Sequence, residues 1–167
     1  MSLPQVEAAR AECVDRHANG PLRDHTAIRW LGKSGATRDL SFNDLAEFSS
    51  RFANVLAGLG VGRGSRVFVL TGRIPELYAA ALGTWKAGGV LCTMFSAFGP
   101  EPIRARMSIG RAEVLVTTST LYQRKVAPIR ASLPDLKHIL SVRDDPEIPV
   151  LADTIDLLTA MAGAQVL

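Results

Sequence analysis

The sequence predicts an α/β domain, with a mostly parallel, doubly wound sheet, flanking helices and an N-terminal β-hairpin. Residues 66–70 and 90–95 are short apolar runs on either side of an amphipathic stretch at 75–86, an order typical of strand, helix and strand. At about 1.5 Å per helical residue and about 3.3 Å per strand residue, helix and strand both measure roughly 17–18 Å, so a right-handed crossover can make the two strands parallel. Strands and helices continue to alternate after residue 100, as in a doubly wound sheet.

The elements before residue 66 form an arm, a hairpin and a long helix. Residues 4–17 have apolar side chains at helical spacing and end at an Asn-Gly-Pro turn, which predicts a short outer helix. Residues 26–31 and 38–41 are extended patterns joined by a turn at 32–37, the signature of a hairpin. Ser41, with Asp44 three residues later, predicts a capping box and the start of a helix that Gly60 ends. We therefore separate an arm, residues 1–25, from an α/β subdomain, residues 26–167.

The helix at 75–86 has clear boundaries. Pro75 suits a first helical turn, where its missing N–H has no partner, and the two glycines at 88–89 end the helix. Its large apolar side chains predict that one face packs on the sheet, with Trp85 largely buried, so that Trp85→Ala would cost roughly 3–5 kcal/mol. The side chains on this face are Leu77, Tyr78, Ala81, Leu82 and Trp85.

The rest of the chain repeats the pattern. We predict a helix at 100–107, a strand at 113–117, a helical stretch at 121–133 interrupted by Pro128, and a strand at 138–142. A polar loop at 144–149 precedes a last amphipathic helix, on which Ile155, Leu158 and Met161 share a face.

Composition narrows the class of protein. The formal charge is +3, and the 19 Lys and Arg residues form no run, which argues against nucleic-acid binding. Two distant cysteines predict a reducing compartment, and no stretch reaches the roughly 18 apolar residues of a membrane span, so a cytoplasmic location is expected. Residues 1–3 resemble an expression leader. The apolar share, about 54% with Gly counted and Tyr left out, exceeds the usual about 45–50%, which suggests that some surface faces protein absent from this sequence.

No catalytic motif emerges from the residues alone. Gly32-Lys33-Ser34 ends like a phosphate-binding loop, but position 27 is Ala where that motif needs Gly, so a hairpin tip is the better interpretation. The glycines between 58 and 64 follow a helix and precede a strand, the reverse of a dinucleotide-binding fingerprint. His17, His25 and His138 lack metal-ligand spacing, and no Ser lies in a nucleophile elbow.

Four stretches nevertheless resemble the N-terminal part of AMP-forming acyl-CoA synthetases of the adenylate-forming superfamily, the acetyl-CoA synthetases above all. They are residues 14–17 (VDRH), 40–45 (LSFNDL), 51–67 (RFANVLAGLGVGRGSRV) and 75–98, which contains PELY, WKAGG and FSAF. Asp44 stands where the family usually has Glu, and Ser65 where it usually has Asp; neither position is catalytic in the family.

The resemblance implies the N-terminal portion of an acetate or short-chain acyl CoA ligase. Such an enzyme activates a small carboxylate with ATP as the acyl-adenylate and transfers the acyl group to coenzyme A. The family's phosphate loop would follow this chain, so ATP, Mg and coenzyme A are implied for the whole enzyme, while no catalytic residue, metal ligand or bound cofactor is expected here. The resemblance places one contact in this chain, the coenzyme A phosphates at Arg124 and Lys125, whose alternative is an exposed basic helix face.

Two functional hypotheses follow. The first is an inactive fragment that needs the remainder of the parent enzyme as its partner. The second is a non-catalytic partner-binding α/β module or a truncated gene product. A sheet cut short would leave a strand edge uncovered, so we expect self-association through residues 114–117, residues 139–142 or the last helix, from Asp153.

Overall fold

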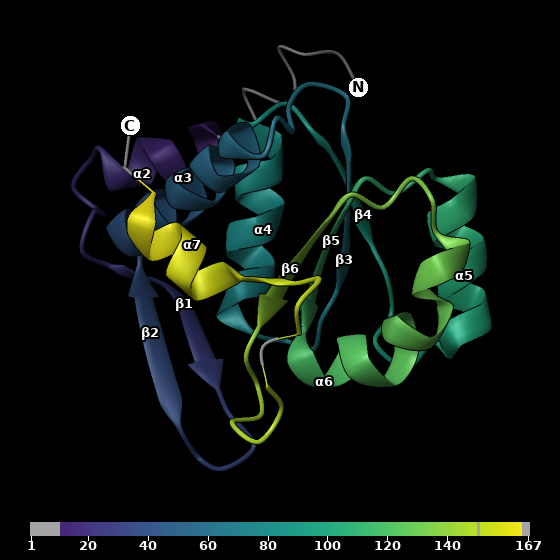
Figure 1. Ribbon diagram of the computed structural model, residues 1–167. Helices are drawn as coiled ribbons and strands as arrows, with labels where there is room; N and C mark the ends of the chain where they lie inside the picture. Colours follow the sequence, from purple (N-terminus) through teal and green to yellow (C-terminus); the bar gives the residue numbers. More distant parts are fainter. Residues whose placement is uncertain (1–10, 150, 165–167) are drawn as a thin grey trace.

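The computed structural model describes residues 11–149 and 151–164. It contains a five-stranded parallel sheet between two layers of helices, and a separate two-stranded hairpin (Figure 1). The hairpin strands are β1 (Thr26–Leu31) and β2 (Thr37–Ser41), and the sheet strands are β3 (Arg66–Leu70), β4 (Val90–Thr93), β5 (Val114–Thr118), β6 (His138–Val142) and β7 (Ile155–Asp156). The helices are α2 (Arg16–Ala18), α3 (Phe42–Gly58), α4 (Pro75–Lys86), α5 (Pro100–Ile109), α6 (Ser119–Leu121) and α7 (Leu157–Gly163), with π-helical turns η1 (Ala11–Asp15) and η2 (Tyr122–Val126) and a 3₁₀ helix, η3 (Ala127–Ser132).

The strand order β4-β3-β5-β6-β7 confirms the predicted doubly wound α/β sheet. The chain moves outward from β3 to β4, returns past β3 to β5, and then continues in the other direction through β6 to β7. The order therefore reverses between β3 and β5, and α4 and α5 lie on opposite faces of the sheet (Figure 1).

Alternate strand residues supply two cores. On one face, Val67, Val69 and Val116 pack with side chains from α3, α4 and α7. On the other face, Phe68 and Leu115 pack with α5 and η2. Strands buried on both faces read as continuous apolar runs, which is why the pattern of the sequence located them.

Most predicted boundaries are confirmed. The hairpin strands pair antiparallel, and β3 and β4 pair in parallel through α4, which begins at Pro75. Gly88 has φ +74°, a conformation that suits the residue after a helix. Ser41 and Asp44 form the reciprocal capping box, and the helical stretch after β5 changes to a 3₁₀ helix at Ala127, next to Pro128.

The arm and the last helix are confirmed in part. Of the helix predicted at residues 4–17, residues 4–10 lie outside the described part of the chain, and residues 11–18 form η1 and α2. The last helix begins at Leu157, because Ile155 and Asp156 pair with β6 as a short strand. Its buried residues are Leu157 and Met161, whereas Leu158 is exposed, so the predicted face was only partly right.

The predicted face of α4 is wrong. The residues buried most completely are small, Ala79, Ala80, Gly83 and Thr84, whereas Trp85 is half-buried. Trp85 packs in a separate cluster with Val14 of the arm and Leu45 of α3, away from the sheet core. The reason is a close approach of α3 to α4: a Cβ at Gly83 would lie 2.6 Å from the carbonyl oxygen of Ser49.

The strands expected at the free edge are internal. Strand β5 lies between β3 and β6 and is buried along its whole length, and β6 lies between β5 and β7. Within the described residues, the long unpaired edge belongs to β4, where Val90 is 48% exposed and Phe95, just beyond the strand, is 66% exposed.

Candidate functional site

Parallel strands β3, β4, β5 and β6 end at one edge of the sheet, which we call the carboxyl edge. In open α/β sheets, ligands bind outside this edge, near the point where the strand order reverses. The loops that follow β3, β4 and β5, together with η2, therefore enclose the region where a ligand site is expected. The residues predicted from the resemblance, Arg124 and Lys125, lie on η2.

The ammonium group of Lys125 is already hydrogen-bonded within the protein. Its Nζ donates hydrogen bonds to the carbonyl oxygens of Ser96, at 2.5 Å, and Phe98, at 2.8 Å. Both carbonyls belong to the loop between β4 and α5. The ammonium group therefore ties η2 to this loop, and we regard Lys125 as a positioning residue instead of a phosphate ligand.

Arg124 is exposed, and its guanidinium has no hydrogen bond or ion pair with the residues that the structure describes. A guanidinium presents a planar fork of donors that matches a phosphate or a carboxylate. The structure thus separates the two predicted residues: Lys125 holds a loop, and Arg124 remains available to a ligand.

The loop held by Lys125 presents aromatic rings that no motif in the sequence marked as part of a site. Phe95 and Phe98 meet edge to face, with ring centroids 5.8 Å apart, and Phe95 is 66% exposed. The guanidinium of Arg106, on α5, lies 4.3 Å from the centroid of the Phe98 ring, within the range of a cation–π contact. A Phe-x-x-Phe run directly after a strand, at the carboxyl edge, was the signal that could have pointed to them.

Asp144 joins the carboxyl ends of β5 and β6. Its Oδ1 accepts hydrogen bonds from the hydroxyl of Ser119, at 2.7 Å, and from the backbone N–H of Thr120, at 3.0 Å. Burial alone would raise the pKa of this carboxyl group, but the donors from Thr120 and Ser119 favour the charged form and hold the pKa below its usual range. The sequence placed Asp144 only in a polar loop.

A second side-chain hydrogen bond links two segments on the same side of the sheet. The hydroxyl of Tyr122, a buried residue of η2, donates to the carboxylate of Asp153, just before β7. Burial, together with this partner, raises the pKa of Tyr122, so the phenol stays protonated. Asp144 therefore fixes α6 and Tyr122 fixes η2, and among the described residues the guanidinium of Arg124, also on η2, has no partner.

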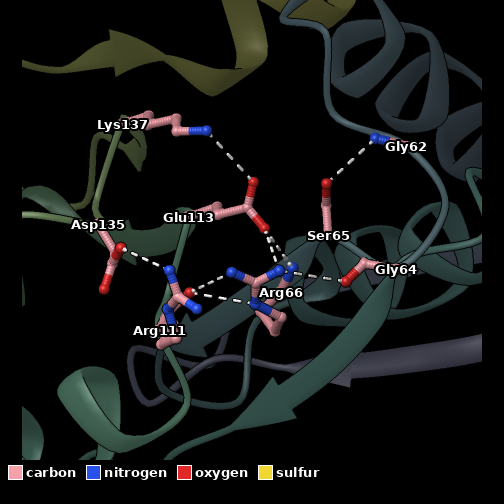
Figure 2. A network of polar contacts seen from close by, with 8 residues as sticks. All are labelled: Gly62, Gly64, Ser65, Arg66, Arg111, Glu113, Asp135 and Lys137. Atoms are coloured by element: carbon pink, nitrogen blue, oxygen red, sulfur yellow. Dashed lines mark hydrogen bonds and ion pairs between the residues drawn. The ribbon is translucent and has the colours of Figure 1, made fainter.

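At the opposite edge of the sheet, where the parallel strands begin, charged side chains pair with one another (Figure 2). We call this the amino edge. Glu113 accepts ion pairs from Arg66, at 2.6 Å, and Lys137, at 3.5 Å. Arg66 also donates to the carbonyl oxygen of Arg111, whose guanidinium lies 3.8 Å from Asp135. These contacts join the amino ends of β3, β5 and β6 and satisfy one another, so this edge has a structural role.

Other residues considered from the sequence have structural positions. His17 packs against Phe42, with ring centroids 4.7 Å apart, and His138 begins β6. Lys33 and Ser34 lie in the hairpin turn, as predicted, and not in a phosphate loop. Within residues 11–149 and 151–164, no three His, Cys, Asp or Glu side chains could hold a metal ion, and no helix is long and apolar enough to cross a membrane.

Comparisons with known proteins agree on one family. Residues 14–159 match the family model described as "AMP-binding enzyme". The chain is 37% identical over 142 residues to an acetyl-coenzyme A synthetase of Gemmatimonas aurantiaca, covering 80% of this chain and 22% of the relative. It is 31% identical over 136 residues to a 3-hydroxypropionyl-coenzyme A synthetase of Metallosphaera sedula, covering 81% of this chain and 21% of the relative. The chain thus spans about a fifth of the length of these curated relatives.

Solved structures support the same fold. An acyl-CoA synthetase of Brucella canis superposes with a TM-score of 0.79 at 27% identity, covering 99% of this chain and 31% of that one. An anthranilate CoA ligase crystallised with anthranoyl-AMP also reaches 0.79, at 19% identity, and covers 95% of this chain and 28% of its own. At that identity the second likeness concerns the fold alone.

Proposed function

The chain belongs to the AMP-binding enzyme family, and from this we propose that it is part of a ligase that joins a small carboxylic acid to coenzyme A. In the proposed reaction, a carboxylate oxygen attacks the α-phosphorus of ATP and releases pyrophosphate. The thiol of coenzyme A then attacks the acyl carbonyl carbon of the adenylate and releases AMP. Acetate or another short-chain acid is the proposed substrate class, since relatives named for acetyl- and 3-hydroxypropionyl-coenzyme A support it.

Within this enzyme, we assign the chain two tasks. The first is to provide the doubly wound sheet as a scaffold. The second is to bind a phosphate of coenzyme A through Arg124. The observation that supports this is that its guanidinium is exposed beside the carboxyl edge and has no partner within residues 11–149 and 151–164. The exposed ring of Phe95 offers a flat apolar face to the adenine of the same molecule, and Lys125 holds that loop in place.

The described residues do not fit the remaining groups of the reaction. They hold no carboxylate cluster for Mg, and the 167 residues contain no Ser/Thr/Gly-rich loop for the phosphates of ATP. We therefore expect the magnesium and ATP contacts in a longer chain, the remainder of which is the proposed partner. A cytoplasmic location belongs to the same proposal, supported by the free cysteines Cys13 and Cys92.

Titration of the 167-residue chain with coenzyme A, followed by NMR, tests the assignment. We expect shifts at residues 95–98 and 122–126, and a loss of affinity of about tenfold in Arg124→Ala, as expected for one charge-assisted hydrogen bond. Arg63→Ala, which removes an exposed Arg elsewhere, is the matched control. Unchanged affinity in Arg124→Ala would refute the site.

A second observation separates the ligase from a non-catalytic module or a truncated product. The coding frame beyond residue 167 should encode a Ser/Thr/Gly-rich loop if the ligase proposal is right. The 167-residue chain by itself should not support acetate-dependent exchange of pyrophosphate into ATP, because it lacks the groups that stabilise charge at the phosphates.

A further inference from the structure

A groove of about 590 Å³ runs between the hairpin and the loop that follows β3. One wall consists of six consecutive residues, Ile28 to Lys33, and the other of Gly72, Arg73, Ile74 and Tyr78. No residue of β2 lines it. Because side chains of a strand alternate between its two faces, a wall of consecutive residues is the edge of β1 and not one of its faces.

The free edge of β1 presents unpaired backbone groups. In an antiparallel pair, only alternate residues bond across the ladder. The N–H of Gly32 donates to the carbonyl of Ala36 at 2.7 Å, so Gly32 and, two residues earlier, Trp30 face β2 with their backbone groups. The N–H and C=O groups of Arg29 and Leu31 therefore point away from β2, and no described residue outside the hairpin bonds to them.

The apolar side chains of the groove include Trp30, whose indole is held in place by a hydrogen bond. The indole Nε1 of Trp30 donates to the carbonyl oxygen of Arg73 at 2.7 Å, which joins the hairpin to the opposite wall. A Cβ at Gly32 would lie 2.8 Å from this ring, so Gly32 lets the indole lie flat on the chain. Leu31 and Tyr78 are 71% and 44% exposed, and with Ile74 they leave apolar surface open beside the unpaired edge.

The charged residues that line the groove are all basic: Arg29, Lys33 and Arg73. Arg29 is paired with Asp39 at 2.7 Å, and Arg38 with Glu76 at 2.9 Å, so these charges are compensated. Lys33 and Arg73 also line the groove, and neither side chain has a hydrogen bond or an ion pair among the described residues. A ligand that fills the groove therefore meets two free cations, one on each wall.

We propose that the edge of β1 binds an extended acidic segment of a partner polypeptide, which adds a third strand to the hairpin. Its backbone would bond to Arg29 and Leu31, its apolar side chains would contact Trp30 and Tyr78, and its carboxylates would pair with Lys33 and Arg73. Strand addition of this kind obtains affinity from main-chain bonds and specificity from alternate side chains. The inference does not depend on the ligase activity or on Arg124.

The test uses acetyl-Glu-Val-Glu-Val-Glu-Val-amide as the probe and NMR of the 167-residue chain as the readout. We expect shifts at residues 29–33 and 72–78, and slowing of amide exchange at Leu31 by about tenfold at a peptide concentration of about ten times the Kd. The same peptide with Lys in place of Glu should bind at least about tenfold more weakly, since it meets like charges.

Two proline variants separate the two edges of the hairpin. Leu31→Pro removes an outward N–H at the groove, whereas Thr37→Pro, at the residue opposite, removes an outward N–H at the other edge. We expect Leu31→Pro to lower the affinity by about tenfold and Thr37→Pro to leave it unchanged. Lys33→Glu and Arg73→Glu should weaken binding, and Arg63→Glu, on another loop, should not.

If Leu31→Pro fails to fold, a peptide N-methylated at alternate residues tests the same backbone pairing with the unaltered protein. This peptide lacks the N–H groups that would bond to β1, so we expect it not to bind. Equal affinity of the Glu and Lys peptides, undiminished binding of the N-methylated peptide, or tight binding by Leu31→Pro would each overturn the proposal. Hexanoate that produces the same shifts with equal affinity would also overturn it, in favour of a small-carboxylate site.

Discussion

At the scale of single residues, the side chains around the carboxyl edge differ in whether they already have hydrogen-bond partners within the protein. Arg124 and Lys125 are neighbours in the sequence and carry the same charge. Consecutive residues of a helix point in different directions, so only one of them can reach the loop at 96–98. The sequence could place both near a ligand, but it could not predict that carbonyl oxygens of the β4–α5 loop would occupy Lys125.

Asp144 provides a prediction about pH. Because its folded-state pKa is lowered, the stability that it contributes is present at neutral pH and is lost as the pH falls below about 4 through the folded pKa. Asp144→Asn should therefore reduce the free energy of unfolding at pH 7 by about 1 kcal/mol, a modest value because the carboxylate is partly exposed. The difference between the two proteins should shrink between pH 4 and pH 2, as judged from urea unfolding at each pH, with pH values chosen around about 3.8, the ordinary pKa of Asp.

Asp24→Asn is the control substitution, since Asp24 is almost fully exposed and lies 4.0 Å from Arg23. It should leave the unfolding free energy at pH 7 nearly unchanged, because an exposed surface pair contributes little. A loss in Asp144→Asn that stays constant down to pH 2 would mean that the ionisation of Asp144 contributes nothing to stability.

At the scale of elements, signals in the sequence located the ends of α4 but not its buried face. Pro75 and Gly88 act locally, through a missing N–H and a positive φ, so the boundaries follow from residue type. The face depends on what lies against the helix. Since α4 is held between the sheet and α3, small residues face its neighbours, and the large Trp85 lies at the margin against the arm. A rule that places large apolar residues inward cannot detect this arrangement.

The contact between α3 and α4 predicts opposite results for two glycines. In Gly83→Ala the new methyl group would lie 2.6 Å from the carbonyl oxygen of Ser49 and 2.7 Å from the ring of Phe52. Because neither the backbone nor the ring can move freely, we expect a loss of about 2–3 kcal/mol in unfolding free energy. At Gly58, the last residue of α3, a Cβ would meet no atom of the described residues within 4 Å, so Gly58→Ala should be neutral or stabilise by up to about 0.5 kcal/mol.

Urea midpoints of the two variants, measured side by side, test this packing. A Gly83→Ala protein as stable as the parent would show that α3 and α4 can separate without loss. The position of Trp85 also lowers the loss expected for Trp85→Ala. Because its indole is only half-buried, the substitution should reduce the unfolding free energy by less than the roughly 3–5 kcal/mol of a fully buried Trp.

At the scale of the whole molecule, the sequence predicted the sheet but not its order of strands. Apolar runs identify buried strands, and all four predicted strands from residue 66 onward were found. Which of them lies at the edge is a property of the connections, because the chain returns past β3 to form β5. The candidate site also depends on how distant segments come together. The resemblance pointed to Arg124, but the aromatic loop and the β1 groove could be found only once the structure had placed segments that are far apart in the sequence.

Because β5 and β6 are internal and β4 lies at the edge of the sheet, we now expect self-association through β4. Residues 90–95 contain no charge and no proline, the devices that usually protect an edge strand, and Val90 and Phe95 are exposed. In the proposed longer enzyme, this edge is where further protein would pack, which also suits the high apolar share. The 167-residue chain alone should therefore associate through β4 as its concentration rises, as measured by light scattering coupled to size-exclusion chromatography.

Thr93→Lys should suppress that association, because it places a charge on the edge strand at an exposed position without removing a core side chain. Ser108→Lys, which adds the same charge to an exposed position on α5, is the control for net charge and should associate like the parent. If both lysine variants dissociate equally, the effect is one of overall repulsion. If the parent chain stays monomeric at high concentration, the β4 edge is not adhesive by itself, and the apolar excess must be explained by the groove beside β1 or by contacts elsewhere on the surface.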